Sequence, residues 1–335
     1  MSHTGSEDLS KEMSSNNFSE TKIKAAAAIK SGVVIKIIVF LAVAAAVYIY
    51  TPVTHQPVKF EPVADGTGLT VTGQKVYVYG SMDDGAKVLR TYSFGDKVPA
   101  DREIEDWYKL KMGRGKYGYL RKSGILAYDL TKKHVALTFD DGPSRKTTPV
   151  VLKALGYNNC RATFFVVGAM INKDTKNIIK QEVSQGCEIG NHSYSHPFLP
   201  HLGKKKVGNQ ISKTDDKVQQ SVGILPKLCR APYGGISHMV LDVMKRPNIS
   251  WSVDTLDWKT RSGRKTFKTV RKRVRDGDIV LMHDIHKATA KIVDKICKFL
   301  KKKDFETVTV TELASIQGKK LLPGKNYNYF RKSKD

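Results

Sequence analysis

From Lys132 onward, short apolar runs alternate with longer segments in which apolar residues recur at helical spacing. The short runs predict buried strands, and the longer segments predict helices with one apolar face. Because strands and helices alternate, we expect a parallel sheet, closed or nearly so, with active groups where strands end and loops begin. The predicted strands cover 134–137, 162–168, 188–191, 249–253, 278–282 and 307–310, and the predicted helices cover 148–156, 174–186 (capped by Asp174), 207–222, 237–244, 267–274 and 288–300.

Residues 74–130 follow a different pattern, in which short runs of strand-forming residues alternate with close turns. Runs such as Lys75–Tyr79 and Trp107–Met112 are separated by glycines and polar turns, so we expect a small all-β barrel. The preceding stretch, 51–73, carries three prolines and is predicted to be a linker. Residues 1–30 are polar, with too few apolar side chains to fold, and predict a disordered cytoplasmic tail.

The apolar run from Val33 to Tyr50 is interrupted only by Lys36 and predicts one transmembrane anchor, residues 31–50. Such a helix would be about 27 Å long, close to the thickness of a bilayer core. Lysines precede the run, whereas no Lys or Arg occurs from 37 to 58, so the positive-inside rule places the later residues outside the cell membrane. A cleaved signal peptide and secretion form the alternative, which the long polar tail before the run disfavours.

The composition of the 335 residues, 40% hydrophobic and 27% charged, fits a globular protein with room for two domains. A formal net charge of +25 predicts attraction to a polyanion. Because the folded part is expected outside the cell, the predicted partners are anionic wall polymers or the membrane surface, and no nucleic acid is expected.

The four cysteines lie far apart in the sequence and include no Cys-x-x-Cys pair. A structural zinc knot is therefore not expected, and buried free thiols are predicted for all four. A disulfide between Cys160 and Cys187 remains the alternative.

Two adjacent carboxylates, Asp140 and Asp141, end a predicted buried strand just before a Gly-Pro turn. Neighbouring carboxylates in a partly dry site repel each other, so at least one needs a proton or a cation. His192 and His196 can converge on the same ion from a helical turn or a tight loop. One carboxylate and two imidazoles leave an open coordination position, as catalytic zinc requires, although Co²⁺, Mn²⁺ or Ni²⁺ could take the same ligands.

Further polar clusters follow at the ends of predicted strands. In chain order the sequence contains Thr-Phe-Asp-Asp-Gly-Pro, His-Ser-x-x-His, Arg-x-Pro-Tyr-Gly, Asp-x-x-Asp-Trp and Leu-x-His-Asp. This ordered set closely resembles the polysaccharide deacetylases with a NodB-type domain, carbohydrate esterase family 4, over about residues 131–317. The resemblance implies an α/β catalytic domain built as a distorted, incomplete (β/α) barrel. The succession of short strands in 74–130 resembles bacterial SH3-like domains, and 318–335 is predicted to be a loose basic tail.

The resemblance assigns roles to the first clusters. Asp141, His192 and His196 match the metal ligands of the family. Asp140 matches the general base, which takes a proton from the water that the metal activates. Arg230 matches the residue that pairs with this base and limits its protonation.

The later clusters match the remaining parts of the family's site. The backbone amide of Tyr233 matches the oxyanion donor. His283 matches the general acid, and Asp257 matches the carboxylate that orients it. Trp258 and Leu281 match the walls around the acetyl methyl group. Ala231 departs from the family by standing where a second proline is common, which leaves the arginine and the tyrosine amide in place.

The implied reaction is metal-dependent N-deacetylation of N-acetylglucosamine in an extracellular glycan, with peptidoglycan as the favoured substrate. Relatives that act on N-acetylmuramic acid often depart from Asp-Asp-Gly-Pro, which this chain retains. Alternatives are a chitin-like or exopolysaccharide N-deacetylase, an O-acetyl esterase, and an inactive wall-binding protein. The last is disfavoured because no ligand and no base is lost.

Overall fold

The computed structural model describes residues 59–72 and 75–331. The predicted cytoplasmic tail, the predicted anchor and residues 51–58 of the predicted linker lie outside the described residues. Within the described ranges, no helix combines the length and apolar character needed to cross a membrane.

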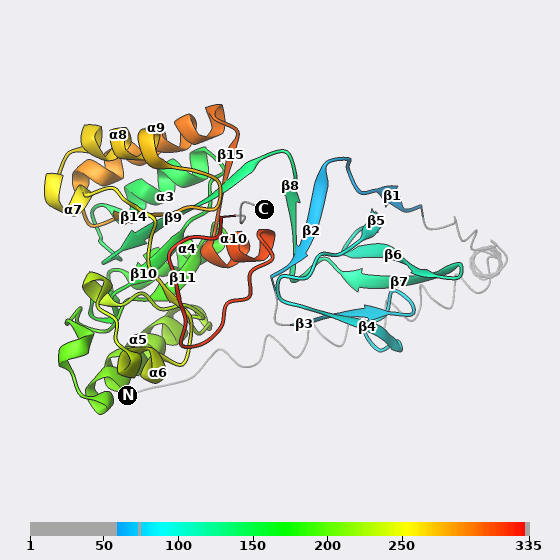
Figure 1. Ribbon diagram of the computed structural model, residues 1–335, viewed down its shortest axis with the longest axis horizontal. Helices are drawn as coiled ribbons and strands as arrows, with labels where there is room; N and C mark the ends of the chain where they lie inside the picture. Colours follow the sequence, from blue (N-terminus) through cyan, green and yellow to red (C-terminus); the bar gives the residue numbers. More distant parts are fainter. Residues whose placement is uncertain (1–58, 73–74, 332–335) are drawn as a thin grey trace, which may run out of the picture. The chain divides into compact units, whose positions relative to one another are not determined.

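The described residues of 61–72 and 75–129 form antiparallel strands around their own apolar core (Figure 1). The strand predicted at 75–79 is present, and alternation places its Val76 and Val78 inside. One sheet has the order β1-β5-β6-β7-β3-β4, and β2 pairs with β8. The strands are β1 (Glu61–Pro62), β2 (Thr67–Val71), β3 (Lys75–Tyr79), β4 (Val88–Ser93), β5 (Ala100–Ile104), β6 (Trp107–Gly113), β7 (Lys116–Arg121) and β8 (Ile125–Asp129).

The predicted linker boundary at residue 73 is wrong for the described residues. Strand β2 lies within that segment and pairs with β8 over its whole length. Leu69 and Val71 are buried in the core of the β region, so this stretch belongs to the folded part. The prolines that indicated a spacer lie before β2, which is why composition alone misplaced the boundary.

The second sheet is parallel, with the order β11-β10-β9-β14-β13, and β15 also pairs with β9. Single-residue bridges from Asn191 to Cys229 and from Cys229 to Asn248 continue this sheet toward β12. The result is a distorted, incomplete barrel, as the sequence predicts. Its strands are β9 (Lys133–Asp140), β10 (Thr163–Val166), β11 (Glu188–Asn191), β12 (Asn248–Ile249), β13 (Val253–Asp254), β14 (Ile279–His283), β15 (Phe305–Val308) and β16 (Asn326–Tyr327).

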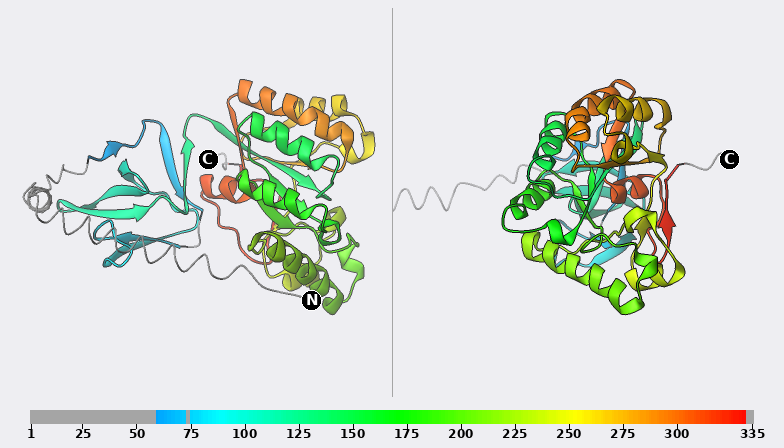
Figure 2. Two further views of the ribbon diagram at one scale, coloured as in Figure 1. Left: turned by 180° about the vertical axis from the view of Figure 1, so that it is seen from behind. Right: turned by 90° about the vertical axis from the view of Figure 1, so that its left-hand side faces the viewer.

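Helices pack on this sheet, and α3, α8 and α9 lie side by side (Figures 1 and 2). Their apolar faces and the strands enclose the largest core cluster, which contains Leu152, Phe164 and Ile296. The helices are α3 (Thr148–Tyr157), α4 (Lys176–Ser184), α5 (Lys204–Val222), α6 (His238–Met244), α7 (Asp257–Thr260), α8 (Gly263–Arg273), α9 (Lys287–Lys302) and α10 (Val310–Ile316), with 3-10 turns η1 (Gly168–Met170), η2 (Leu199–His201) and η3 (Pro232–Gly234). All four cysteines are buried and free of disulfides, as predicted.

Three local predictions are wrong. The strand predicted at 249–253 is two strands, because β12 pairs with β16 while β13 pairs with β14. Asp174 does not cap α4, which starts at Lys176 without a side-chain cap. Val310 begins a helix instead of ending a strand, because Thr309 and Glu312 form a capping box.

The segment 318–331, predicted as part of a loose tail, is packed onto the barrel. Its strand β16 pairs with β12, and Arg331 Nη2 lies 2.6 Å from Asp278 Oδ1. Phe330 is 2% exposed and belongs to the core cluster with Ile249 and Ile279. The many lysines of this segment suggested solvation, but its aromatic residues supply the buried contacts.

We expect Phe330→Ala to lower the free energy of unfolding by about 3–5 kcal/mol, because it removes a buried ring and leaves a cavity. Tyr329→Ala is the matched control, since its side chain is 50% exposed, and should cost less than about 1 kcal/mol. Urea unfolding of the two variants measures both values. Equal effects would mean that the segment is not part of the core.

Candidate active site

Two acidic residues and two histidines meet at the carboxyl ends of neighbouring strands. Asp140 ends β9, and Asp141 follows it with a φ of 75°. His192 and His196 lie in the loop after β11, which is a tight loop with positive φ at His196 and not a helical turn. The ligand atoms of Asp141, His192 and His196 all lie within 4.8 Å of one another.

The three side chains fit a divalent cation. Asp141 Oδ1 lies 3.3 Å from His196 Nε2 and 3.5 Å from His192 Nε2, and this buried oxygen has no hydrogen-bond donor among the described residues. His192 Nδ1 lies 2.7 Å from the Arg230 carbonyl oxygen, which orients the ring and leaves Nε2 for the ion. Burial lowers the pKa of His192 to about 3, so its imidazole is neutral and able to act as a ligand.

The second carboxylate, Asp140, is held by a buried arginine. Arg230 Nη1 donates to Asp140 Oδ1 at 2.6 Å, and Arg230 is 1% exposed. The guanidinium also donates to Thr138 Oγ1 and to the carbonyl oxygens of Ile249 and Ser250. Burial raises the pKa of Asp140, and the charge of Arg230 opposes that increase. The predicted pair is therefore present, and the arginine is fixed by four acceptors.

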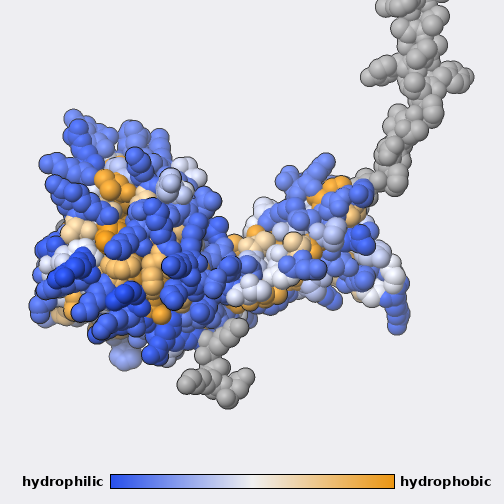
Figure 3. Space-filling model, turned by 90° about the horizontal axis from the view of Figure 1, so that it is seen from above, coloured by the Kyte–Doolittle hydropathy of each residue, from blue (hydrophilic) through white to orange (hydrophobic). Residues whose placement is uncertain are grey.

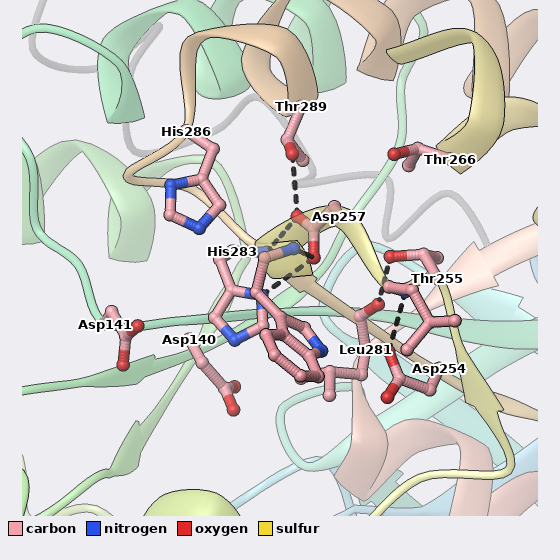
Figure 4. Close-up of polar contacts among 12 residues, drawn as sticks. Asp140, Asp141, Asp254, Thr255, Asp257, Thr266, Leu281, His283, His286 and Thr289 are labelled. Carbon is pink, nitrogen blue, oxygen red and sulfur yellow. Dashed lines mark hydrogen bonds and ion pairs between the residues drawn. The ribbon is translucent and has the colours of Figure 1, made fainter. Parts of the chain in front are cut away.

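His283 stands opposite Asp140, because the two residues are register partners in β14 and β9. Its Nδ1 lies 2.8 Å from Asp257 Oδ1, and its backbone N–H donates to Asp257 Oδ2 (Figure 4). Thr289 Oγ1 also donates to Asp257 Oδ2, at 2.6 Å. Burial alone would lower the pKa of His283, but the hydrogen bond to Asp257 and the charges of Asp140, Asp257 and Asp141 raise it to about 9. The ring is therefore protonated at neutral pH, as a general acid must be.

The remaining predicted residues surround this centre to different degrees. Tyr233, in η3, has a φ of 59°, and its ring centroid lies 4.5 Å from that of His196. Trp258 follows Asp257 and is half-exposed, so its indole is available to a substrate. Leu281 lies in β14 and is buried, which makes it also a core residue.

Thr289 and Thr138 were not among the residues predicted for the site. Each fixes a charged member of it: Thr289 donates to Asp257, and Thr138 accepts from Arg230. Thr138 is the first residue of the Thr-Phe-Asp-Asp-Gly-Pro motif, but nothing in the sequence indicates that its hydroxyl accepts from Arg230. Thr289 had no sequence signal, because its contact with Asp257 depends on how α9 packs.

Asp257→Asn tests the electrostatic origin of the His283 pKa. The protonated fraction of His283 falls as pH rises through its pKa, so activity that needs this proton declines on the alkaline side. Removing the Asp257 charge lowers that pKa toward the ordinary value of about 6.5. The pH–kcat profile of the metal-loaded variant should therefore decline at a lower pH than that of the wild type. An unchanged alkaline limb would show that His283 does not control it.

The structure is an α/β protein with a distorted, incomplete parallel barrel and a candidate metal site, the Asp-His-His cluster, at its strand ends. Comparison with known proteins specifies the class further. The model of the family described as polysaccharide deacetylase matches residues 127–250. A peptidoglycan-N-acetylglucosamine deacetylase of Bacillus cereus is 32% identical over 204 residues, which cover 58% of this chain and 95% of that protein. The chain belongs to the polysaccharide deacetylase family.

Two longer relatives share this region. The peptidoglycan-N-acetylglucosamine deacetylase PgdA of Listeria monocytogenes is 44% identical over 197 residues, 59% of this chain and 41% of PgdA. The peptidoglycan-N-acetylmuramic acid deacetylase PdaC of Bacillus subtilis is 35% identical over 209 residues, 62% of this chain and 44% of PdaC. A solved PdaC structure superposes with a TM-score of 0.55 at 37% identity, covering 57% of this chain and 94% of that structure. The chain thus spans less than half the length of PgdA and PdaC.

Proposed function

We propose that this protein is a metal-dependent enzyme that removes acetyl groups from N-acetylglucosamine residues of peptidoglycan. The observation that carries the proposal is the geometry around Asp140. The Asp141-His192-His196 cluster adjoins it, and Arg230 fixes its carboxylate. The protonated His283 is its register partner on β14. Metal-assisted amide hydrolysis requires a base, an acid and a cation site that converge on the same substrate atoms.

The chain's own residues divide the reaction. Bound by Asp141, His192 and His196, Zn²⁺, or Co²⁺, Mn²⁺ or Ni²⁺ in its place, would supply a Lewis acid for water and for the acetamide carbonyl. Asp140 accepts the proton of the attacking water. The Tyr233 backbone N–H donates to the carbonyl oxygen as it becomes negative. His283 protonates the departing nitrogen, the C–N bond breaks, and acetate and a free sugar amine leave.

Trp258 and Leu281 give the acetyl methyl group its contacts in this proposal. The indole of Trp258 is half-exposed beside Asp257, and Leu281 precedes His283 by two positions on β14. An acetyl group between them would present its carbonyl carbon toward Asp140. The O-acetyl esterase reaction would use the same walls, so only product analysis separates the two.

Peptidoglycan N-acetylglucosamine is favoured over N-acetylmuramic acid because identity is higher to PgdA than to PdaC, 44% against 35%. Mass spectrometry of muropeptides after incubation with the metal-loaded full-length protein tests the choice. We expect the loss of one acetyl group on the glucosamine unit. Loss from muramic acid alone, or from no sugar, would contradict this proposal. Activity only on chitin oligomers would show that the substrate is a chitin-like glycan and not peptidoglycan.

We further propose that residues 31–50 anchor the enzyme in the cell membrane with the deacetylase domain outside, and that 74–130 is an SH3-like module. A peptidoglycan substrate supports the outside location, because this polymer lies beyond the membrane. The net charge of +25 supports contact with anionic wall polymers or lipid head groups. Protease added to intact cells should degrade the deacetylase domain, and protection of that domain would overturn the orientation.

A further inference from the structure

Two packed helices, α8 and α9, carry many basic side chains and almost no acidic ones, and α9 begins next to the active site. Helix α8 contains no acidic residue, and α9 contains only Asp294, which pairs with Lys298. Figure 3 views the molecule from above Figure 1 and shows hydrophilic side chains on both sides of a hydrophobic band on this face of the deacetylase domain. The basic residues of the two helices are Arg264, Lys265, Lys268, Arg271, Lys272 and Arg273 in α8, and Lys287, Lys291, Lys295, Lys298, Lys301 and Lys302 in α9.

A pocket of about 530 Å³ lies at the start of α9. Three cationic side chains line it, Arg261, Lys287 and Lys291, together with Ile285, His286 and Ala288. The three cations are exposed, and within the described part of the chain no carboxylate forms a salt bridge with any of them. No acidic residue lines the pocket. The side chains that line the pocket therefore carry a net positive charge, which attracts anions.

This pocket adjoins the catalytic acid. The ring centroids of His283 and His286 lie 5.5 Å apart, and Figure 4 shows the two rings next to each other. The Arg261 guanidinium contacts the ring nitrogens of His286. Arg261 follows α7, whose first residue is Asp257, the partner of His283. One wall, residues 283–286, thus separates the pocket from the place where the sugar amine leaves.

The position of the pocket fits a charged substituent of a sugar that neighbours the one being deacetylated. In peptidoglycan, each N-acetylglucosamine is linked to a muramic acid whose lactyl-linked peptide carries carboxylates. A chitin chain has no such groups. Arginine and lysine both bind carboxylates through charge-assisted hydrogen bonds, which are stronger than neutral ones.

We propose that Arg261, Lys287 and Lys291 form a subsite for a carboxylate of the muramyl peptide next to the reacting N-acetylglucosamine. This inference rests on the proposed deacetylation of peptidoglycan. It adds a physical reason why the enzyme would bind peptidoglycan more tightly than a neutral glycan. The cations act on substrate binding, since they lie beyond the acid and the base and touch no reacting atom. They are specificity residues, and the neutral sugar reaction does not need them.

The test compares two soluble substrates, a neutral N-acetylglucosamine oligomer and a disaccharide-peptide muropeptide, with the metal-loaded full-length protein. The variant carries Arg261→Gln, Lys287→Gln and Lys291→Gln. We expect KM for the muropeptide to rise about 10-fold or more, since hydrogen bonds to charged groups are lost, with kcat little changed. KM and kcat for the neutral oligomer should stay as in the wild type.

A matched control carries Lys268→Gln, Lys272→Gln and Arg273→Gln, which remove the same charge from α8 outside the pocket. This control should leave the muropeptide KM within about twofold of the wild type, because distant exposed charges are screened by salt. Equal losses in the two triple variants, or equal losses on both substrates, would overturn the subsite.

Binding separates this inference from the proposed reaction. Calorimetric titration of muropeptide into Asp140→Asn protein, with and without the three pocket substitutions, does not depend on turnover. A Kd that rises about 10-fold with the pocket substitutions supports the subsite, and an unchanged Kd rejects it. Absence of acetate release from every glycan by the wild type would reject the deacetylase proposal alone.

Discussion

Asp140→Asn should lower kcat for acetate release by about 10²- to 10⁴-fold while the metal content stays near that of the wild type. Asparagine keeps the size of the side chain and an oxygen that can accept from Arg230, but it cannot take a proton from the attacking water. Because Asp140 is buried against Arg230, bulk water cannot take over its role as the base. Acetate release and metal analysis on the same sample measure both quantities.

Asp141→Asn is the paired control, since it replaces the neighbouring carboxylate with an amide, the same chemical change as in Asp140→Asn. Its oxygen is shared at 3.3 and 3.5 Å by the two histidines, so its charge should be needed to hold the ion. We expect this variant to lose metal and activity together. If Asp140→Asn lost the metal and Asp141→Asn kept it, the proposed roles of the two residues would be reversed.

His283→Asn should have the other large effect, and this effect should depend on the leaving group. A sugar amine leaves only after protonation, so hydrolysis of an N-acetyl sugar should slow by about 10²- to 10⁴-fold. An aryl acetate ester releases a phenolate that needs no proton, and its hydrolysis should change far less. Asparagine can still donate to Asp257, which preserves the local packing.

Asp140→Asn again provides the comparison, because the base is needed for both substrates. It should slow the amide and the aryl ester alike, whereas His283→Asn slows mainly the amide. Initial rates of acetate release from both substrates give the ratio for each variant. Equal losses on the two substrates for His283→Asn would show that His283 supports the site structurally and does not act as the acid.

Asp140, Asp141, His192 and His283 could be expected to lie near one another, because each stands at or just after the end of a predicted parallel strand. Asp140 and Asp141 follow an apolar run, and their charges in a dry setting demand a cation or a proton. The family resemblance then assigned His283 and Arg230 to the same site. The parallel pairing of β14 with β9 brings His283 next to Asp140. No local sequence pattern specifies this register. The alternation of strands and helices implies only that the strands are parallel.

Three of the wrong predictions concern contacts between distant segments, whereas those at Asp174 and Val310 concern local capping. The split of the predicted strand at 249–253 follows from two different partner strands, and β2 is a strand because β8 pairs with it. Phe330 joins the core from a lysine-rich segment whose composition indicates solvation. Each of these features gains its free energy from a long-range contact, so propensity and composition near the residue could not reveal it.

Acetate release from purified peptidoglycan, measured together with metal content in the full-length protein, tests the central claim most directly. We expect the protein to hold one divalent ion per chain and to release each acetate together with one free amine on a glucosamine unit. Removal of the ion by a chelator should abolish the release of acetate and the appearance of the amine. Metal-loaded wild-type protein that releases no more acetate than Asp140→Asn would contradict it.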